Sequence, residues 1–265
     1  MLPQNKHSFH IVDQSPWPLI NSLNLMNFLS AIVMIIKTNY FLNKYLILLL
    51  LVTMVTSMML WWRDIIREST FQGNHTFPVF NMLKNSMILF ILSEIMFFTS
   101  FFWAFSHFSL NPEFEIGNSW PPCMIKMINP YHLPLLNTII LLSSGAMVTW
   151  AHYSILTYNY KCMLMSLSMT ILMGMVFTLA QMIEYNWTEY AINDSNFGSI
   201  FFMTTGFHGI HVMIGSSFLT VNLYRILKNQ LNNMHHFSFE AAIWYWHFVD
   251  VVWIYLYIIM YWWFY

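Results

Sequence analysis

The sequence predicts an all-α polytopic membrane protein with seven transmembrane helices. Of its 265 residues, 58% are hydrophobic and only 8% are charged, whereas an ordinary soluble domain has roughly 25% charged residues. The apolar residues gather in long runs, and about 20 such residues are enough to cross a hydrocarbon core of roughly 30 Å. The connecting segments have neither the length nor the composition of a soluble domain, so we expect a single membrane domain over residues 1–265.

The first four expected spans follow the uncharged runs of the N-terminal half. Lys37 separates the first two runs, and the second ends at Trp61 and Trp62, residues of the kind that gathers at membrane interfaces. The third run carries one acid in its centre. The fourth opens with Pro130 and Pro134, which suit the first turn of a helix.

The last three expected spans contain most of the glycines. A missing side chain lets helix backbones approach closely, and five of the eight glycines lie in the fifth and sixth spans: Gly174, Gly198, Gly206, Gly209 and Gly215. The seventh span contains Glu240 and Asp250, so hydropathy alone also allows a six-span count. The expected spans are about residues 17–36, 41–62, 80–108, 130–153, 161–183, 191–227 and 233–263.

The charges predict an orientation and exclude one class of partner. In the seven-span frame, seven basic residues lie on one side (Lys6, Arg63, Arg67, Lys84, Lys161, Arg225 and Lys228) and three on the other (Lys37, Lys44 and Lys126). The positive-inside rule therefore places the N-terminus inside and the C-terminus outside. Glu184, just after the fifth span, is expected on an outer connection. Ten basic and eleven acidic residues provide no basic stripe, so nucleic acid is not an expected partner.

Glu94 lies in the middle of the third span, in SMILFILSEIMFFTSFFWAF. An acid at a helix centre costs roughly 2.5–3.5 kcal/mol on insertion scales, so such a residue usually faces the bundle interior and has a partner or a task. Lys and Arg are absent within one helical turn, so a partner must come from another span. Three interpretations remain open: a proton-exchanging carboxyl, a hydrogen-bond donor to a neighbouring helix, and a group facing headgroups or water.

Two further pairs of polar residues share helix faces. His208 and His211 are three residues apart in TTGFHGIHVMIG, and His247 and Asp250 repeat the spacing in YWHFVD. Hydrogen bonds between helices explain such groups. A metal site needs three or four converging ligands, and a haem needs axial ligands at matching depth, which His152 and His208 do not offer. We therefore expect polar helix contacts and neither a metal nor a haem in this chain.

A charged segment, WWRDIIRESTFQGNHT, follows the second span. Its alternating charges are typical of a solvated helix end that the two tryptophans anchor at the interface. Guanidinium groups beside tryptophans also suit the phosphate oxygens of lipids. On this second interpretation Arg63, Arg67 and His75 hold a phospholipid headgroup.

Six segments together resemble subunit III of mitochondrial cytochrome c oxidase over essentially the whole chain. They are HSFHIVDQSPWPL, WWRDIIRESTFQGNHT, LSEIMFFTSFFWAF, NTIILLSSGAMVTWAH, GSIFFMTTGFHGIHVMIGSSF and HHFSFEAAIWYWHFVDVVWIYLY. The resemblance implies seven helices in two groups, the first two separated from the last five by a V-shaped cleft that holds phospholipids. It also implies that haem and copper belong to subunits I and II, and that Glu94 is the family's buried, carbodiimide-reactive carboxyl.

The function implied by this resemblance is that of a non-catalytic core subunit of respiratory complex IV, the proton-pumping oxidoreductase. The subunit would steady the oxygen-reducing core and support proton uptake, with subunit I as its main contact and subunit II and accessory subunits nearby. It would lie in the mitochondrial inner membrane with its N-terminus in the matrix and its C-terminus toward the intermembrane space. The alternative is a proton-coupled transporter that uses Glu94, although we find no internal repeat of the kind common in transporters.

Overall fold

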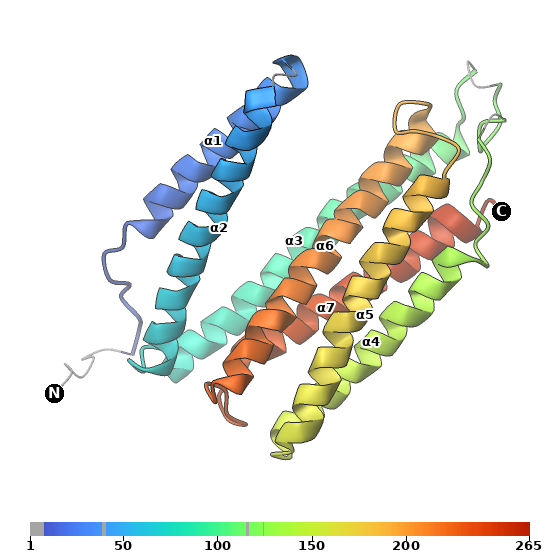
Figure 1. The fold of residues 1–265 in the computed structure, drawn as a ribbon. Helices are drawn as coiled ribbons and strands as arrows, with labels where there is room; N and C mark the ends of the chain where they lie inside the picture. Colours follow the sequence, from blue (N-terminus) through green and yellow to red (C-terminus); the bar gives the residue numbers. More distant parts are fainter. Residues whose placement is uncertain (1–7, 39–40, 115–116, 124) are drawn as a thin grey trace. The chain divides into compact units, whose positions relative to one another are not determined.

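The computed structural model describes residues 8–38, 41–114, 117–123 and 125–265. Within these ranges, seven helices are long and apolar enough to cross a membrane and strands are absent, which confirms the all-α fold class. Lys6 lies outside the described residues, as does the side chain of Lys44. In chain order the elements are α1 (Trp17–Thr38), α2 (Phe41–Thr70), α3 (Phe77–Leu110), α4 (Leu133–Leu156), α5 (Tyr160–Trp187), α6 (Asn196–Leu227), α7 (Phe237–Leu256) and the π-helical η2 (Tyr257–Trp262) (Figure 1).

Local sequence signals explain where these helices begin and end. α2 continues past Trp62 to Thr70, so the charged segment is helical, and the chain turns away at Gly73 with a φ of 68°. α4 has a proline in its first turn, where a missing backbone N–H costs nothing. α6 begins only at Asn196 because the side chain of Ser195 caps it by accepting a hydrogen bond from the Gly198 N–H.

The last helix is continuous through both of its acids. α7 includes Glu240 and Asp250 and runs directly into η2. The six-span alternative is therefore unnecessary, since helical hydrogen bonding does not break at either acid. A π-helical end widens the last turns of the helix near the C-terminus.

The chain forms two compact units: an N-terminal unit, Met1–Leu83, and a C-terminal unit, Lys84–Tyr265. In the N-terminal unit α1 packs on α2 through polar contacts. The Ser57 hydroxyl donates to Asn21 Oδ1 over 2.7 Å, and Asn24 Nδ2 donates to the same hydroxyl over 3.1 Å. Only 6% of the most apolar stretch of each helix is buried. The apolar surface of this hairpin is thus left for lipid or protein neighbours.

The C-terminal unit contains a tight group of four helices, α4 to α7. α4 packs against α5 and α7, and α6 packs against the same two helices (Figure 1). Of the most apolar stretch of the last helix, 56% is buried. Between these helices lies the fully buried indole of Trp246, whose Nε1 donates to Ser144 Oγ over 2.9 Å.

Two of the expected glycines make room for this indole. A Cβ added to Gly174 or Gly215 would lie 2.8 or 2.9 Å from a carbon of Trp246. The expectation of close approach is wrong for Gly209, because a Cβ there would meet nothing within 4 Å. Helix phase explains the difference, since Gly209 and Gly215 lie on different faces of α6.

α3 meets α6 and α7 through aromatic rings. The rings of Phe98 and Phe248 are 6.1 Å apart, and those of Phe105 and Phe197 are 6.2 Å apart. Glu94 lies one helical turn before Phe98 and therefore shares its face. The packing of these rings turns the Glu94 carboxyl toward α6.

Candidate functional site

The structure pairs Glu94 with a histidine from another helix. Glu94 Oε2 on α3 lies 2.9 Å from His211 Nε2 on α6. The Glu94 side chain is 24% exposed and that of His211 is 10% exposed. Two residues that the sequence analysis considered separately therefore form one site near the surface of the C-terminal unit.

The hydrogen bonds of His211 define how many protons this pair holds. His211 Nδ1 lies 2.7 Å from the carbonyl oxygen of Phe207. A carbonyl oxygen only accepts, so Nδ1 carries a hydrogen. The bond between Nε2 and Glu94 then contains one further proton. With the proton on Glu94 both groups are neutral, and with the proton on His211 they form an ion pair, so the pair has no net charge in either arrangement.

Aromatic rings surround His211. The ring of Phe98 lies edge-on at 5.0 Å, that of Phe248 lies edge-on at 6.2 Å, and the ring of Tyr245 stacks at 6.2 Å with an interplanar angle of 16°. These rings enclose the imidazole, whose side chain is only 10% exposed.

His208 has a different environment, although it is only one turn away. It is fully buried, and its Nε2 donates to the backbone carbonyl of Val249 on α7 over 3.2 Å. Its ring lies between those of Phe177 and Trp253, at 5.5 and 5.1 Å. The side chain therefore joins α6 to α7.

His247 and Asp250 lie beside each other on α7. His247 Nδ1 is 3.7 Å from Asp250 Oδ2, and the histidine is partly exposed while the acid is buried. A Cβ on Gly145 of α4 would lie 2.6 Å from the same carboxylate oxygen. Gly145 thus lets α4 approach the Asp250 carboxylate.

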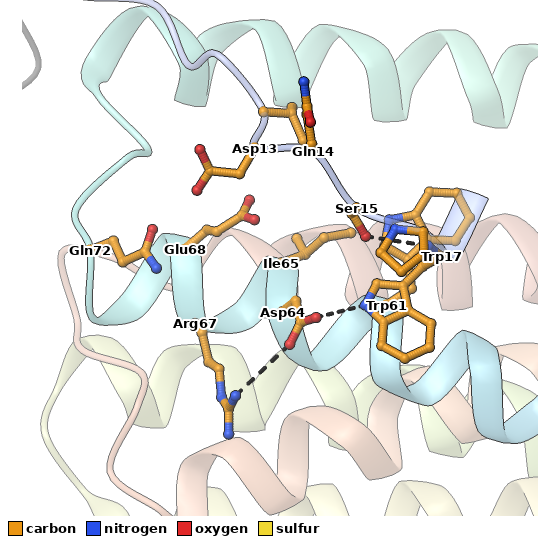
Figure 2. A pocket seen from close by; sticks show the side chains of 12 residues that line it. Asp13, Gln14, Ser15, Trp17, Trp61, Asp64, Ile65, Arg67, Glu68 and Gln72 are labelled. Carbon is orange, nitrogen blue, oxygen red and sulfur yellow. Dashed lines mark hydrogen bonds and ion pairs between the residues drawn. The ribbon is translucent and has the colours of Figure 1, made fainter. Parts of the chain in front are cut away.

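Of the three residues expected at a lipid headgroup, the structure places Arg67 at a cavity. This cavity, of about 290 Å³, lies in the N-terminal unit and also contains Trp17, Trp61 and the acids Asp13, Asp64 and Glu68 (Figure 2). Arg63 is not among its lining residues and pairs with Asp64 over 3.0 Å. The His75 ring lies 6.1 Å from that of His10.

Asp64 organises one wall of this cavity. Its Oδ2 accepts a hydrogen bond from the Trp17 indole over 2.7 Å, and its Oδ1 lies 3.9 Å from Arg67 Nη1 (Figure 2). Glu68 Oε2 lies 3.1 Å from His10 Nε2. The cavity therefore presents carboxylates, indoles and one guanidinium together.

Comparison with known proteins decides the family. A family model described as cytochrome c oxidase subunit III matches residues 7–265. This chain belongs to the cytochrome c oxidase subunit III family. Proteins named cytochrome c oxidase subunit 3 from Rhipicephalus sanguineus and Halichoerus grypus are both 52% identical to it, covering 97% of this chain and 99% and 97% of their own lengths. The protein of that name from Pisaster ochraceus is 51% identical over 98% of both chains.

Membership of the cytochrome c oxidase subunit III family confirms the resemblance seen in six sequence segments. It also makes the seven-helix fold and the place of the chain in an oxidoreductase complex secure, and the transporter alternative is not favoured. The roles expected for individual residues stay predictions.

Sequence reasoning missed one polar group in this family member. Glu184, expected on a connection, lies in α5 and is only 2% exposed. Its Oε1 accepts hydrogen bonds from Tyr261 over 2.6 Å and from Gln181 over 3.2 Å. A signal was available, because Phe177, Gln181 and Glu184 follow the spacing of one helix face.

Proposed function

We propose that this chain works as a non-catalytic core subunit of cytochrome c oxidase, and that its Glu94–His211 pair holds and exchanges a proton for the complex. Family membership supports the first part. The single observation that carries the second is the hydrogen bond of 2.9 Å between the two side chains. One proton moves along this bond without a change in the net charge of the pair.

The position of the pair suits proton uptake rather than catalysis. The Glu94 carboxyl is partly exposed while His211 is more enclosed by aromatic rings. A proton from water or from a neighbouring subunit therefore reaches Glu94 first. Burial of an unpaired charge is costly in a membrane. After gaining or losing a proton, the pair therefore goes back to its state without net charge, and so acts as a local proton store.

The subunit context follows from the same proposal. Haem and copper lie in partner subunits, subunit I is the main contact, and subunit II and accessory subunits lie nearby. The chain spans the mitochondrial inner membrane with its N-terminus in the matrix, an orientation supported by the excess of basic residues on that side. His208 joins α6 to α7, whereas His247 and Asp250 contact each other within α7.

Phospholipid binding is a second part of the proposed role. Arg67 provides a partner for a phosphate, and the carboxylates and indoles of the same cavity suit an ammonium group. The cavity thus fits a zwitterionic headgroup, with Arg63 and His75 as flanking contacts. The lipid-filled cleft between the two helix groups stays a prediction.

Replacement of Glu94 by Gln tests the proton-holding role in the assembled oxidase. Glutamine keeps the shape and removes the exchangeable proton, so we expect electron transfer to fall by less than about tenfold, a barrier change of about 1.4 kcal/mol. Proton uptake per electron should decrease, and carbodiimide should no longer label this position. Glu189→Gln is the matched control, because Glu189 lies in an exposed ion pair with Lys126.

Two results would contradict this proposal. A Glu94→Gln enzyme that assembles normally but transfers no electrons would make the residue catalytic. Unchanged proton uptake in both Glu94→Gln and His211→Gln would show that the pair is only a helix contact. For the lipid site, Arg67→Gln should reduce co-purifying phospholipid more than Arg63→Gln, and equal lipid content in wild type and both variants would refute it.

A further inference from the structure

Three potential metal ligands converge in the C-terminal unit, away from the Glu94–His211 pair. One ligand atom from each of His152, His236 and Glu240 lies within 4.8 Å of the other two. His152 lies in the last turns of α4, His236 is the N-cap of α7, and Glu240 is in the first turn of α7. Two imidazoles and one carboxylate form a common ligand set for zinc in proteins.

The spacing within α7 already matches metal geometry. His236 Nε2 lies 3.4 Å from Glu240 Oε1. In a tetrahedral zinc site with bonds of about 2.0–2.1 Å, neighbouring ligand atoms are about 3.3–3.4 Å apart. Residues four apart on a helix face the same side, so the backbone itself holds these two atoms at the required separation.

A second hydrogen bond orients the His236 ring. Its Nδ1 donates to the backbone carbonyl of Asn232 over 3.1 Å. A carbonyl oxygen only accepts, so Nδ1 carries the hydrogen and Nε2 has a lone pair in the neutral ring. Metal-binding histidines typically have this arrangement, because the outer hydrogen bond fixes the tautomer and the ring orientation.

Both histidines direct nitrogens without hydrogen bonds to this place. Among the described residues, His152 Nε2 and His236 Nε2 are buried and have no hydrogen-bond partner. His236 is only 6% exposed, and its ring centroid lies 5.5 Å from that of His152. Buried polar atoms nearly always have a partner. A cation shared by the two rings would give both nitrogens a partner.

A lysine contacts the Glu240 carboxylate from outside the set of three ligands. Lys84 Nζ lies 2.9 Å from Glu240 Oε2, the carboxylate oxygen that does not face His236. The ion pair orients the carboxylate so that Oε1 faces the histidines. It also opposes a cation electrostatically, which makes the affinity of the site tunable through one residue.

We propose that His152, His236 and Glu240 bind one divalent transition-metal ion of the zinc type, with water as a fourth ligand. The ion joins the end of α4 to the start of α7 and takes no part in electron transfer. From the sequence we expected no metal in this chain, and this proposal departs from that expectation because His236 and Glu240 were not considered there as partners of His152. The proposal does not depend on the proton-holding role of Glu94.

The test measures zinc in the assembled oxidase that contains the full chain. The enzyme is stripped with a chelator, equilibrated with zinc chloride, desalted and analysed for zinc per chain by mass spectrometry. We expect wild type to retain one zinc more than His236→Gln and His152→Gln. His235→Gln is the matched control, since it removes the adjacent histidine and leaves the three ligands in place; it should retain as much zinc as wild type.

Lys84→Gln separates a metal site from a purely polar network. Removal of the opposing charge should tighten zinc binding by about tenfold, whereas a network held together by the Lys84–Glu240 ion pair would only lose stability. Equal zinc in wild type and both histidine variants, or weaker binding in Lys84→Gln, overturns the proposal. If the histidine variants fail to assemble, anomalous scattering at the zinc edge from the wild-type oxidase decides the matter. Zinc absent from between the two rings then refutes it.

Discussion

Replacement of Gly215 by Ala tests whether close packing around Trp246 holds the C-terminal unit together. A Cβ at this position would lie 2.9 Å from Trp246 Cε3 and 3.2 Å from Cζ3. Carbon atoms normally pack at about 3.5–4.0 Å. The indole cannot retreat easily, because it is fully buried and Gly174 lies against it as well.

The expected cost follows from this overlap. Extra carbon atoms in a well-packed core typically cost 1–3 kcal/mol, so we expect Gly215→Ala to destabilise the unit by about 2 kcal/mol. Gly209→Ala is the matched control on the same helix, since its Cβ would meet nothing within 4 Å. It should be neutral or slightly stabilising, because alanine favours helix more than glycine does.

Resistance of the full chain to unfolding in mixed detergent micelles provides the assay, with assembly into the oxidase as a second measurement. Trp246→Phe removes ring atoms that a Cβ at position 215 would contact. The Gly215→Ala/Trp246→Phe double variant should therefore lose about 1 kcal/mol less stability than the two single variants lose in sum. The reasoning fails if Gly215→Ala unfolds like wild type, or if Gly209→Ala is the more damaging change.

Three further changes test other contacts. Tyr261→Phe should cost about 1–3 kcal/mol, because it removes a donor from the buried Glu184 carboxyl. Trp17→Phe should loosen the N-terminal unit through loss of the indole bond to Asp64. Burial raises the pKa of Tyr190 far above its ordinary value, so its phenol should not appear in an absorbance titration between about pH 9 and 11. As pH rises past the ordinary tyrosine pKa, the unfolded chain loses this proton first and the folded state loses stability.

Exposed residues of the same types serve as controls for these changes. Tyr255→Phe and Trp62→Phe alter side chains that are exposed. Both should leave stability within about 0.5 kcal/mol of wild type. Tyr190→Phe should leave the absorbance titration between about pH 9 and 11 unchanged. Losses as large in the controls as in the buried positions would contradict these assignments.

The sequence predicted the membrane class, the seven helices and the family correctly. Long apolar runs have one stable arrangement in lipid, because a helix satisfies every backbone hydrogen bond within itself. The predicted positions of the helix ends were less accurate. The charged segment after Trp62 continues α2 to Thr70, and Glu184 lies inside α5 rather than beyond it. Charge alone does not end a helix, so hydropathy placed these limits too early.

The sequence did not predict which polar residues pair with each other. Glu94 and His211 are separated by 117 residues, and His152 lies far along the chain from His236 and Glu240. Their meeting depends on how each helix is rotated about its axis and how deep it lies. These helices are apolar on nearly all sides, so no hydrophobic stripe marks the face that turns inward.

By itself, then, the sequence determined how often the chain crosses the membrane and to which family it belongs, because both depend on the order and the length of apolar segments. Only the tertiary structure decided which carboxyl meets which imidazole and which glycines receive the Trp246 ring. Those contacts come from the interlocking of side chains between helices, where shifts of an ångström or two make or break a hydrogen bond.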